Sequence, residues 1–151
     1  MDVERYLAIH DRCIEITTRY FVEQSNFVAP SSVAHDEIRI EGDLICQGGL
    51  VIHISETLER DRRNQVRCID FRYQAQFAGP PHRRIFRYDN AHIYSRRGHP
   101  DAFQKHVFSN RSWRETSVEH IGRHQFPTLP EVIDELFDCW VQNRDDPLVY
   151  P

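Results

Sequence analysis

Hydrophobic positions near the N-terminus recur every three or four residues. That spacing puts them on one face of an amphipathic helix, which Asp2 can cap. The stripe consists of Val3, Tyr6, Leu7, His10, Cys13, Ile14, Thr17, Tyr20 and Phe21. Because His10 lies on this stripe, we expect it to be a histidine at the edge of the core rather than a ligand-binding residue.

After residue 38 the hydrophobic period changes to two, the pattern of β-strands. The first such strand runs from Ile38 to Cys46, with Gly42 as an expected bulge or bend. Residues 47–49, Gln-Gly-Gly, predict a hairpin turn. The second strand puts Glu56 on a face that is otherwise apolar. Such a carboxylate must be paired, protonated or at the rim of a site, unless the sheet edge exposes it.

Further strands and a second helix complete the pattern. Strands are expected from Ile69 to Phe77, from Arg84 to Tyr88 and from Lys105 to Phe108, whereas residues 109–126 show no clear period. A Thr128–Glu131 capping box then opens a helix with one apolar stripe. The chain therefore predicts an α+β fold, an antiparallel meander of about five to six strands with the N-terminal and C-terminal helices packed on one face.

Length and composition limit the classes of protein to which the chain can belong. A chain of 151 residues fits a single domain, residues 1–151, ending in a polar tail at 143–151. No run approaches the roughly 18 apolar residues of a membrane helix, and no basic, apolar signal segment opens the chain. We therefore expect a cytoplasmic protein with no membrane partner. The four cysteines are isolated, which indicates reduced core residues rather than zinc ligands.

Charge is unevenly distributed along the chain. Residues 79–124 carry nine Lys and Arg against four Asp and Glu, within a chain whose net charge is −4. The same segment holds six of the nine histidines. A basic, histidine-rich face suits RNA, another phosphate-bearing ligand or an acidic protein, although a solvated surface without a partner has the same pattern.

Within that segment, chemically active side chains concentrate between residues 87 and 106. Gly98 and Pro100 interrupt any regular element there, so we expect a loop held by a strand end. For catalysis the candidates are His99, His106, Lys105 and Asp89. For substrate binding they are Arg87, Tyr88, Asn90, Tyr73, His92 and Glu56. Two histidines can act as base and acid, and Arg87 and Lys105 can stabilise a phosphorane, so metal-independent RNA cleavage fits without a cofactor.

Several candidates have a structural alternative. Asp89 and Asn90 make a good turn pair, and Asp89 can bond local amides or Arg87. A metal site built from Asp89 and three histidines is also open, but their spacing matches no known motif. Serine-nucleophile, phosphate-loop and dinucleotide motifs are absent.

The motifs around this segment resemble the TumE toxin family. The resemblance rests on three motifs: Arg-Tyr-Asp-Asn-Ala at 87–91, His99-Pro100 and Lys105-His106. Upstream, Glu56 and residues 71–73 also follow the order found in the family. The resemblance covers roughly residues 44–140. Two departures are His92-Ile93-Tyr94 in place of Pro-His-His after the alanine, and Phe103-Gln104-Lys105-His106 in place of His-His-Lys-His. The resemblance implies a toxin of a toxin–antitoxin pair, with a cognate antitoxin protein as its partner.

Three hypotheses remain open from the sequence. The first is a toxin that acts as an endoribonuclease through the residues above. The second is a non-catalytic module that binds nucleic acid or an antitoxin segment, and the third is a metal-dependent hydrolase. Whether the chain forms a homodimer also stays open.

Overall fold

The computed structural model describes residues 1–28, 30–34, 36–90, 103–122 and 125–146. Two helices frame the described chain, α1 (Val3–Thr17) and α2 (Leu129–Asn143). Between them lie eight strands: β1 (Val22–Phe27), β2 (Ser31–Ala34), β3 (Glu37–Cys46), β4 (Leu50–Arg60), β5 (Val66–Phe77), β6 (Arg84–Asp89), β7 (Gln104–Phe108) and β8 (Glu115–His120). A short 3₁₀ turn, Gln47–Gly49, joins β3 to β4 at the position where the hairpin was expected.

All eight strands belong to one antiparallel sheet in the order β1-β3-β4-β5-β6-β7-β8, with β2 also paired to β3. The α+β meander is confirmed, but the sheet has more strands than the five to six predicted. The additional strands β1, β2 and β8 lie at the sheet edges. All six residues of β8 are exposed, as are four of six in β1. Edge strands bury too few side chains to impose an alternating pattern.

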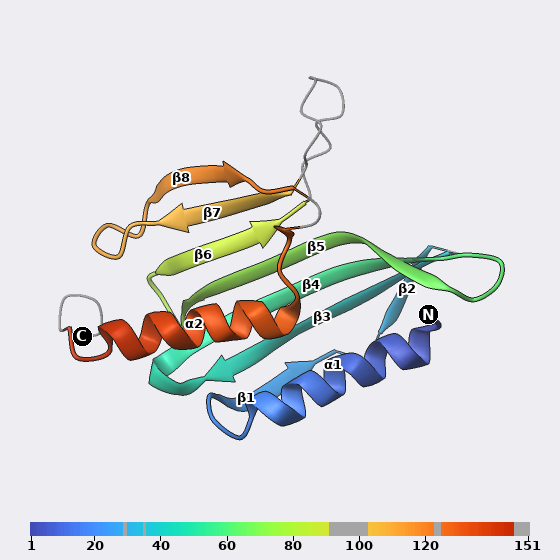
Figure 1. Cartoon of the computed structure of the whole chain (residues 1–151), viewed down its shortest axis with the longest axis horizontal. Coiled ribbons are helices and arrows are strands. Elements are labelled where there is room, and N and C mark those ends of the chain that lie inside the picture. Colours follow the sequence, from blue (N-terminus) through green and yellow to red (C-terminus); the bar gives the residue numbers. More distant parts are fainter. Residues whose placement is uncertain (29, 35, 91–102, 123–124, 147–151) are drawn as a thin grey trace.

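Both helices pack on the same face of the sheet (Figure 1). Asp2 accepts the amide of Arg5 at the start of α1, and Glu131 accepts the amide of Thr128 at the start of α2, so both expected caps are present. We call the covered side the helix face and the opposite side the outer face. The core between helices and sheet includes Phe21, Leu44, Leu50, Ile52, Ala75, Phe77, Phe86, Val132, Ile133 and Leu136.

Gly42 does not make the predicted bulge. Strand β3 keeps continuous register with β4 through this residue, where Gly42 pairs with Ile54. On its other side Gly42 pairs with Phe27, and a Cβ built at Gly42 would lie 2.6 Å from the Phe27 ring. The glycine is therefore required by an aromatic ring that packs on the backbone.

No helix among the described residues is long and apolar enough to cross a membrane. The four cysteines are free thiols, with Cys13 and Cys46 buried. Burial raises the pKa of the Cys13 thiol to about 11 and that of Cys46 to about 12, as expected for structural cysteines.

Candidate functional site

Strands β6 and β7 bring the two halves of the predicted site side by side. In their register Arg87 pairs with His106, and Tyr88 pairs with Lys105. Because side chains alternate along a strand, the two pairs point to opposite faces of the sheet. Tyr88 belongs to the core under the helices, so Arg87, Asp89 and His106 share the outer face.

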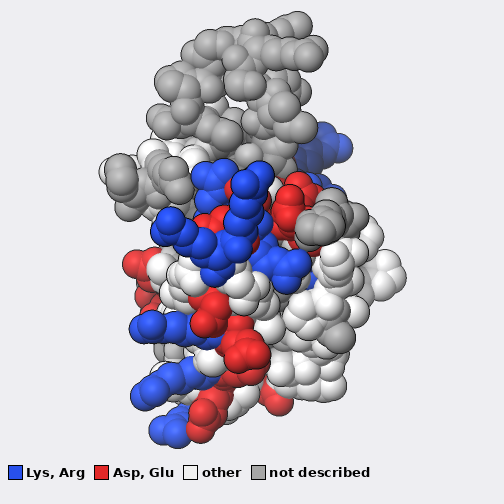
Figure 2. All heavy atoms as spheres, turned by 90° about the vertical axis from the view of Figure 1, so that its right-hand side faces the viewer, with Lys and Arg blue, Asp and Glu red and all other residues white. Residues whose placement is uncertain are grey.

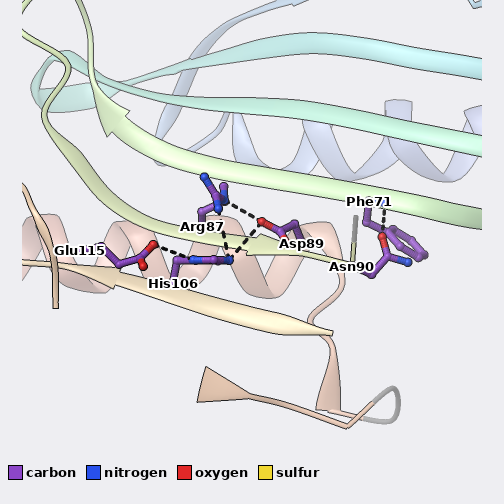
Figure 3. A network of polar contacts seen from close by, with 6 residues as sticks. All are labelled: Phe71, Arg87, Asp89, Asn90, His106 and Glu115. Atoms are coloured by element: carbon purple, nitrogen blue, oxygen red, sulfur yellow. Dashed lines mark hydrogen bonds and ion pairs between the residues drawn. The ribbon is translucent and has the colours of Figure 1, made fainter. Parts of the chain in front are cut away.

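On the outer face these residues form a connected polar network with a residue of β8 (Figure 3). Arg87 Nε donates to Asp89 Oδ2 at 2.6 Å. His106 Nε2 lies 3.3 Å from the same oxygen and 3.2 Å from Arg87 Nη2. On the other side of the ring, His106 Nδ1 lies 2.7 Å from Glu115 Oε2. We call Arg87, Asp89, His106 and Glu115 the outer-face cluster.

The geometry around His106 accommodates both protonation states of the imidazole. The Glu115 carboxylate can only accept, so Nδ1 carries a hydrogen. In the neutral ring, Nε2 has a lone pair that can accept from Arg87. In the imidazolium, Nε2–H can donate to Asp89. Nε2 therefore has a hydrogen-bond partner in either protonation state, as a general acid or base requires.

Arg87 contacts two side chains of this cluster that could also serve as metal ligands. Its guanidinium contacts both the Asp89 carboxylate and the His106 ring. Among the described residues, no group of three or more His, Cys, Asp or Glu is arranged to hold a metal.

Tyr88 and Lys105 lie on the helix face and meet α2. The Tyr88 hydroxyl donates to Glu135 Oε2 at 2.5 Å, and Lys105 Nζ donates to Glu135 Oε1 at 2.6 Å. Burial and the Glu135 hydrogen bond raise the pKa of Tyr88 to about 12. Burial opposes the charge on Lys105, but its hydrogen bonds to Glu135 and Tyr88 raise its pKa overall. Both residues thus tie the sheet to α2, on the side away from His106.

Glu56 is the centre of a second polar group, on the helix face under α1. Its side chain is buried, with the residue 1% exposed. Tyr73 donates to Oε1 at 2.6 Å, Tyr6 donates to Oε2 at 2.8 Å, and His10 Nε2 lies 3.1 Å from Oε2. Burial alone would raise the pKa of Glu56, but His10 and the two hydroxyls hold it below its usual value. The out-of-pattern carboxylate is thus paired rather than exposed at an edge.

Asn90 continues from β6 and closes this end of the sheet. Its side-chain oxygen accepts the amide of Phe71 at 2.7 Å, and its nitrogen donates to the carbonyl of Ile69 at 3.0 Å (Figure 3). The side chain therefore adds to the pairing with β5 at the end of β6, where the Asn90 amide also donates to the Phe71 carbonyl. The remaining predicted site residues, His92 and His99, lie outside the described residues.

Three residues of the outer-face cluster and the Glu56 group were not predicted from the sequence. Glu115 lies in the segment without a clear period, and nothing local marks it as a partner of His106. Tyr6 and His10 lie on the apolar stripe of α1, where they were expected to be core residues. Their spacing of four residues puts both side chains on the same face of α1. That they bond Glu56 follows only from the way α1 packs on the sheet.

The side of the molecule shown in Figure 2 carries mixed charge. On the side of the molecule in Figure 2, Lys and Arg side chains gather beside the undescribed residues, and acidic side chains lie among and below them. An anionic ligand that approaches this side therefore meets arginine guanidinium groups, since the one lysine of the chain, Lys105, is bonded to Glu135.

Fold and site together define a small α+β protein whose helix-covered sheet carries an Arg–Asp–His–Glu cluster on its outer face. A family model described as toxin TumE matches residues 11–144, and the chain belongs to the TumE toxin family. That membership indicates a toxin of a toxin–antitoxin system, with an antitoxin as its partner. Comparisons with curated proteins and with solved structures found no match.

Proposed function

We propose that the protein is a toxin that cleaves RNA without a metal ion, with His106 as a proton-transfer group. The supporting observation is the pair of alternative partners at His106 Nε2, Asp89 for the protonated ring and Arg87 for the neutral one. Glu115 holds the other ring nitrogen and so fixes the tautomer and the orientation. A carboxylate–imidazole pair beside a guanidinium supplies both acid–base chemistry and phosphate recognition.

In this mechanism the 2′-hydroxyl of RNA loses its proton to a base and attacks the adjacent phosphorus. The bond from phosphorus to the 5′-oxygen breaks, and that oxygen receives a proton from an acid. The products are a 2′,3′-cyclic phosphate and a 5′-hydroxyl end. We assign one of the two proton transfers to His106 and the stabilisation of the phosphorane charge to Arg87. His99 and His92 are the sequence candidates for the second proton transfer.

The test is incubation of the purified protein with single-stranded RNA of mixed sequence, with and without EDTA. We expect cleavage in both conditions and 5′-hydroxyl ends on the products. His106→Ala should reduce the rate about 100-fold or more, the usual loss for a general acid or base. Intact RNA with the folded wild-type protein would refute the proposal, and so would cleavage that EDTA abolishes.

His53→Ala is a matched control for His106→Ala. His53 Nδ1 lies 2.6 Å from Asp43 Oδ1, so it is also an imidazole–carboxylate pair. It lies in the same row of the outer face, since His53 pairs with Gln74, Gln74 with Arg87 and Arg87 with His106. It is half-exposed and has no part in the outer-face cluster. We expect its removal to leave cleavage within about threefold of wild type, because it lies outside the reacting groups.

A binding function is the second candidate, and one observation favours it. Asp89 is 1% exposed and His106 4% exposed, so an RNA backbone does not reach them in this conformation. In a binding module the outer-face cluster would instead keep the end of the sheet rigid, and the surface above it would bind RNA or the antitoxin. An RNA gel-shift assay separates the two functions. Retained RNA affinity with lost cleavage in His106→Ala supports an enzyme, and lost affinity without any cleavage by the wild type supports a binder.

A further inference from the structure

A cavity of about 640 Å³ lies on the helix face, apart from the outer-face cluster. It is bounded by α1, by the first half of β5 and by the segment that leads into α2. Its volume is in the range of small-molecule and cofactor sites. Apolar side chains make most of the wall: Ile9, Ile69, Phe71, Tyr73, Phe103 and Phe126.

Aromatic rings dominate one side of the cavity and are arranged around Phe126. Its ring centroid lies 5.2 Å from that of Phe71, 5.3 Å from that of Phe103 and 6.1 Å from that of Tyr73. Phe126 is only partly buried, although Tyr73 belongs to the core and Phe71 packs against it. Such a wall suits a planar ring that can stack against it, rather than a flexible aliphatic chain.

The part of the cavity wall that α1 provides carries a polar atom that lacks a partner. His10 lines the cavity, and its Nε2 is held by the Glu56 carboxylate. Its Nδ1 is buried and has no hydrogen-bond partner within the described part of the chain. Because a carboxylate only accepts, the hydrogen of a neutral ring lies on Nε2, and Nδ1 keeps a lone pair. Buried polar atoms are almost always hydrogen-bonded, so this nitrogen lacks an N–H donor, which a ligand supplies if the His10 ring turns to face the cavity.

We propose that the cavity binds a nucleobase, stacked against Phe126 and hydrogen-bonded through an N–H group to His10 Nδ1. The choice of a nucleobase over another planar heterocycle rests on the proposed action on RNA. Position supports the link, because Asn90 lines the cavity while its chain neighbour Asp89 belongs to the outer-face cluster. A nucleotide at the end of β6 therefore meets a base site on one side and cationic and acid–base groups on the other.

The test is an NMR titration of the full chain with adenosine 5′-monophosphate and cytidine 5′-monophosphate, with inorganic phosphate as the control ligand. The signals to follow are the amides of Phe71 and Phe126 and the ring nitrogens of His10. We expect saturable shifts with at least one nucleotide and none with phosphate at these positions. The His10 Nδ1 resonance should shift on binding, because it gains a hydrogen bond.

Two variants locate the binding. Phe126→Leu keeps the wall apolar but removes the stacking ring, and it should weaken binding about tenfold or more. Phe137→Leu is its control, since Phe137 packs on Tyr20, Phe21 and Trp140 rather than on the cavity. In His10→Gln the side-chain amide can still donate to Glu56 while Nδ1 is lost, so that variant should also bind more weakly.

The outcomes separate this inference from the proposed function. Mononucleotide binding that Phe126→Leu weakens and Phe137→Leu spares supports the base site, even if the protein cleaves no RNA. Absence of shifts at Phe71, Phe126 and His10 at millimolar nucleotide overturns it, even if the protein cleaves RNA. Equal losses of affinity in the two Phe→Leu variants also overturn it, because the effect would then come from the core as a whole.

Discussion

Asp89 and Asn90 are neighbours in the chain, yet their side chains serve opposite sides of the sheet. Asp89 bonds Arg87 in the outer-face cluster, while Asn90 bonds the β5 backbone and lines the cavity under the helices. The pleat of the strand imposes this division. A run of polar residues that looks like one site in the sequence is therefore divided between two faces of the fold.

The Arg87–Asp89 pair should contribute substantially to stability. Arg87→Ala removes the guanidinium that pairs with the buried Asp89 carboxylate, and we expect the free energy of unfolding to fall by about 3 kcal/mol. Urea denaturation measures this loss. Arg67→Ala is the control, because the Arg67–Glu59 pair is exposed and should contribute less than about 1 kcal/mol. Equal effects of the two substitutions would contradict a special role for the outer-face cluster.

Acid should weaken the fold through Glu56. Its pKa is lowered in the folded protein from the reference value of 4.5, so its contribution is present above that pH and is lost as the pH falls through the lower folded value. Glu56→Gln should be less stable than wild type at pH 7 by about 1–3 kcal/mol, because a buried acceptor is replaced. The difference should shrink below pH 4.5, measured by urea denaturation from pH 7 to pH 3. A constant difference would show that Glu56 carries no depressed pKa.

Lys105 provides a test of which face of the sheet is chemically active. Lys105→Met removes the bond to Glu135 but keeps an unbranched apolar stem under α2. We expect a loss of about 1 kcal/mol in stability, since one charged hydrogen bond is removed. RNA cleavage should stay within about threefold of wild type, because Lys105 points away from His106. A 100-fold loss of cleavage in a folded variant would instead assign the chemistry to the helix face.

Gly42 should tolerate no side chain. In Gly42→Ala the new methyl group meets the Phe27 ring, and displacement of that ring should cost about 1–3 kcal/mol. Gly122→Ala is the matched control, because nothing lies within 4 Å of a Cβ built there. Thermal unfolding of both variants checks the prediction. A Gly42→Ala variant as stable as Gly122→Ala would show that Phe27 does not pack on this backbone.

Periodicity predicts the centre of this fold well and its margins poorly. Strands β4, β5 and β6 and both helices follow from apolar spacing, because each buries one regular face. Strands β1 and β8 bury little and β2 has only four residues, so no pattern marks them. The site divides in the same way. The segment from residue 87 to residue 106 was expected to carry the site because of its composition. The roles of Glu115 and His10 could not be predicted, because they depend on sheet register and helix packing, which local sequence does not specify.

Strand β8, at the edge of the sheet, determines how firmly the His106 imidazole is held. Glu115, which orients His106, comes from β8, a strand with no buried residue and with only β7 beside it in the sheet. Fraying of such a margin requires little free energy compared with global unfolding. The His106 ring would then lose its Glu115 partner while the interior stays intact, so the orientation of the ring depends on a strand at the margin of the sheet.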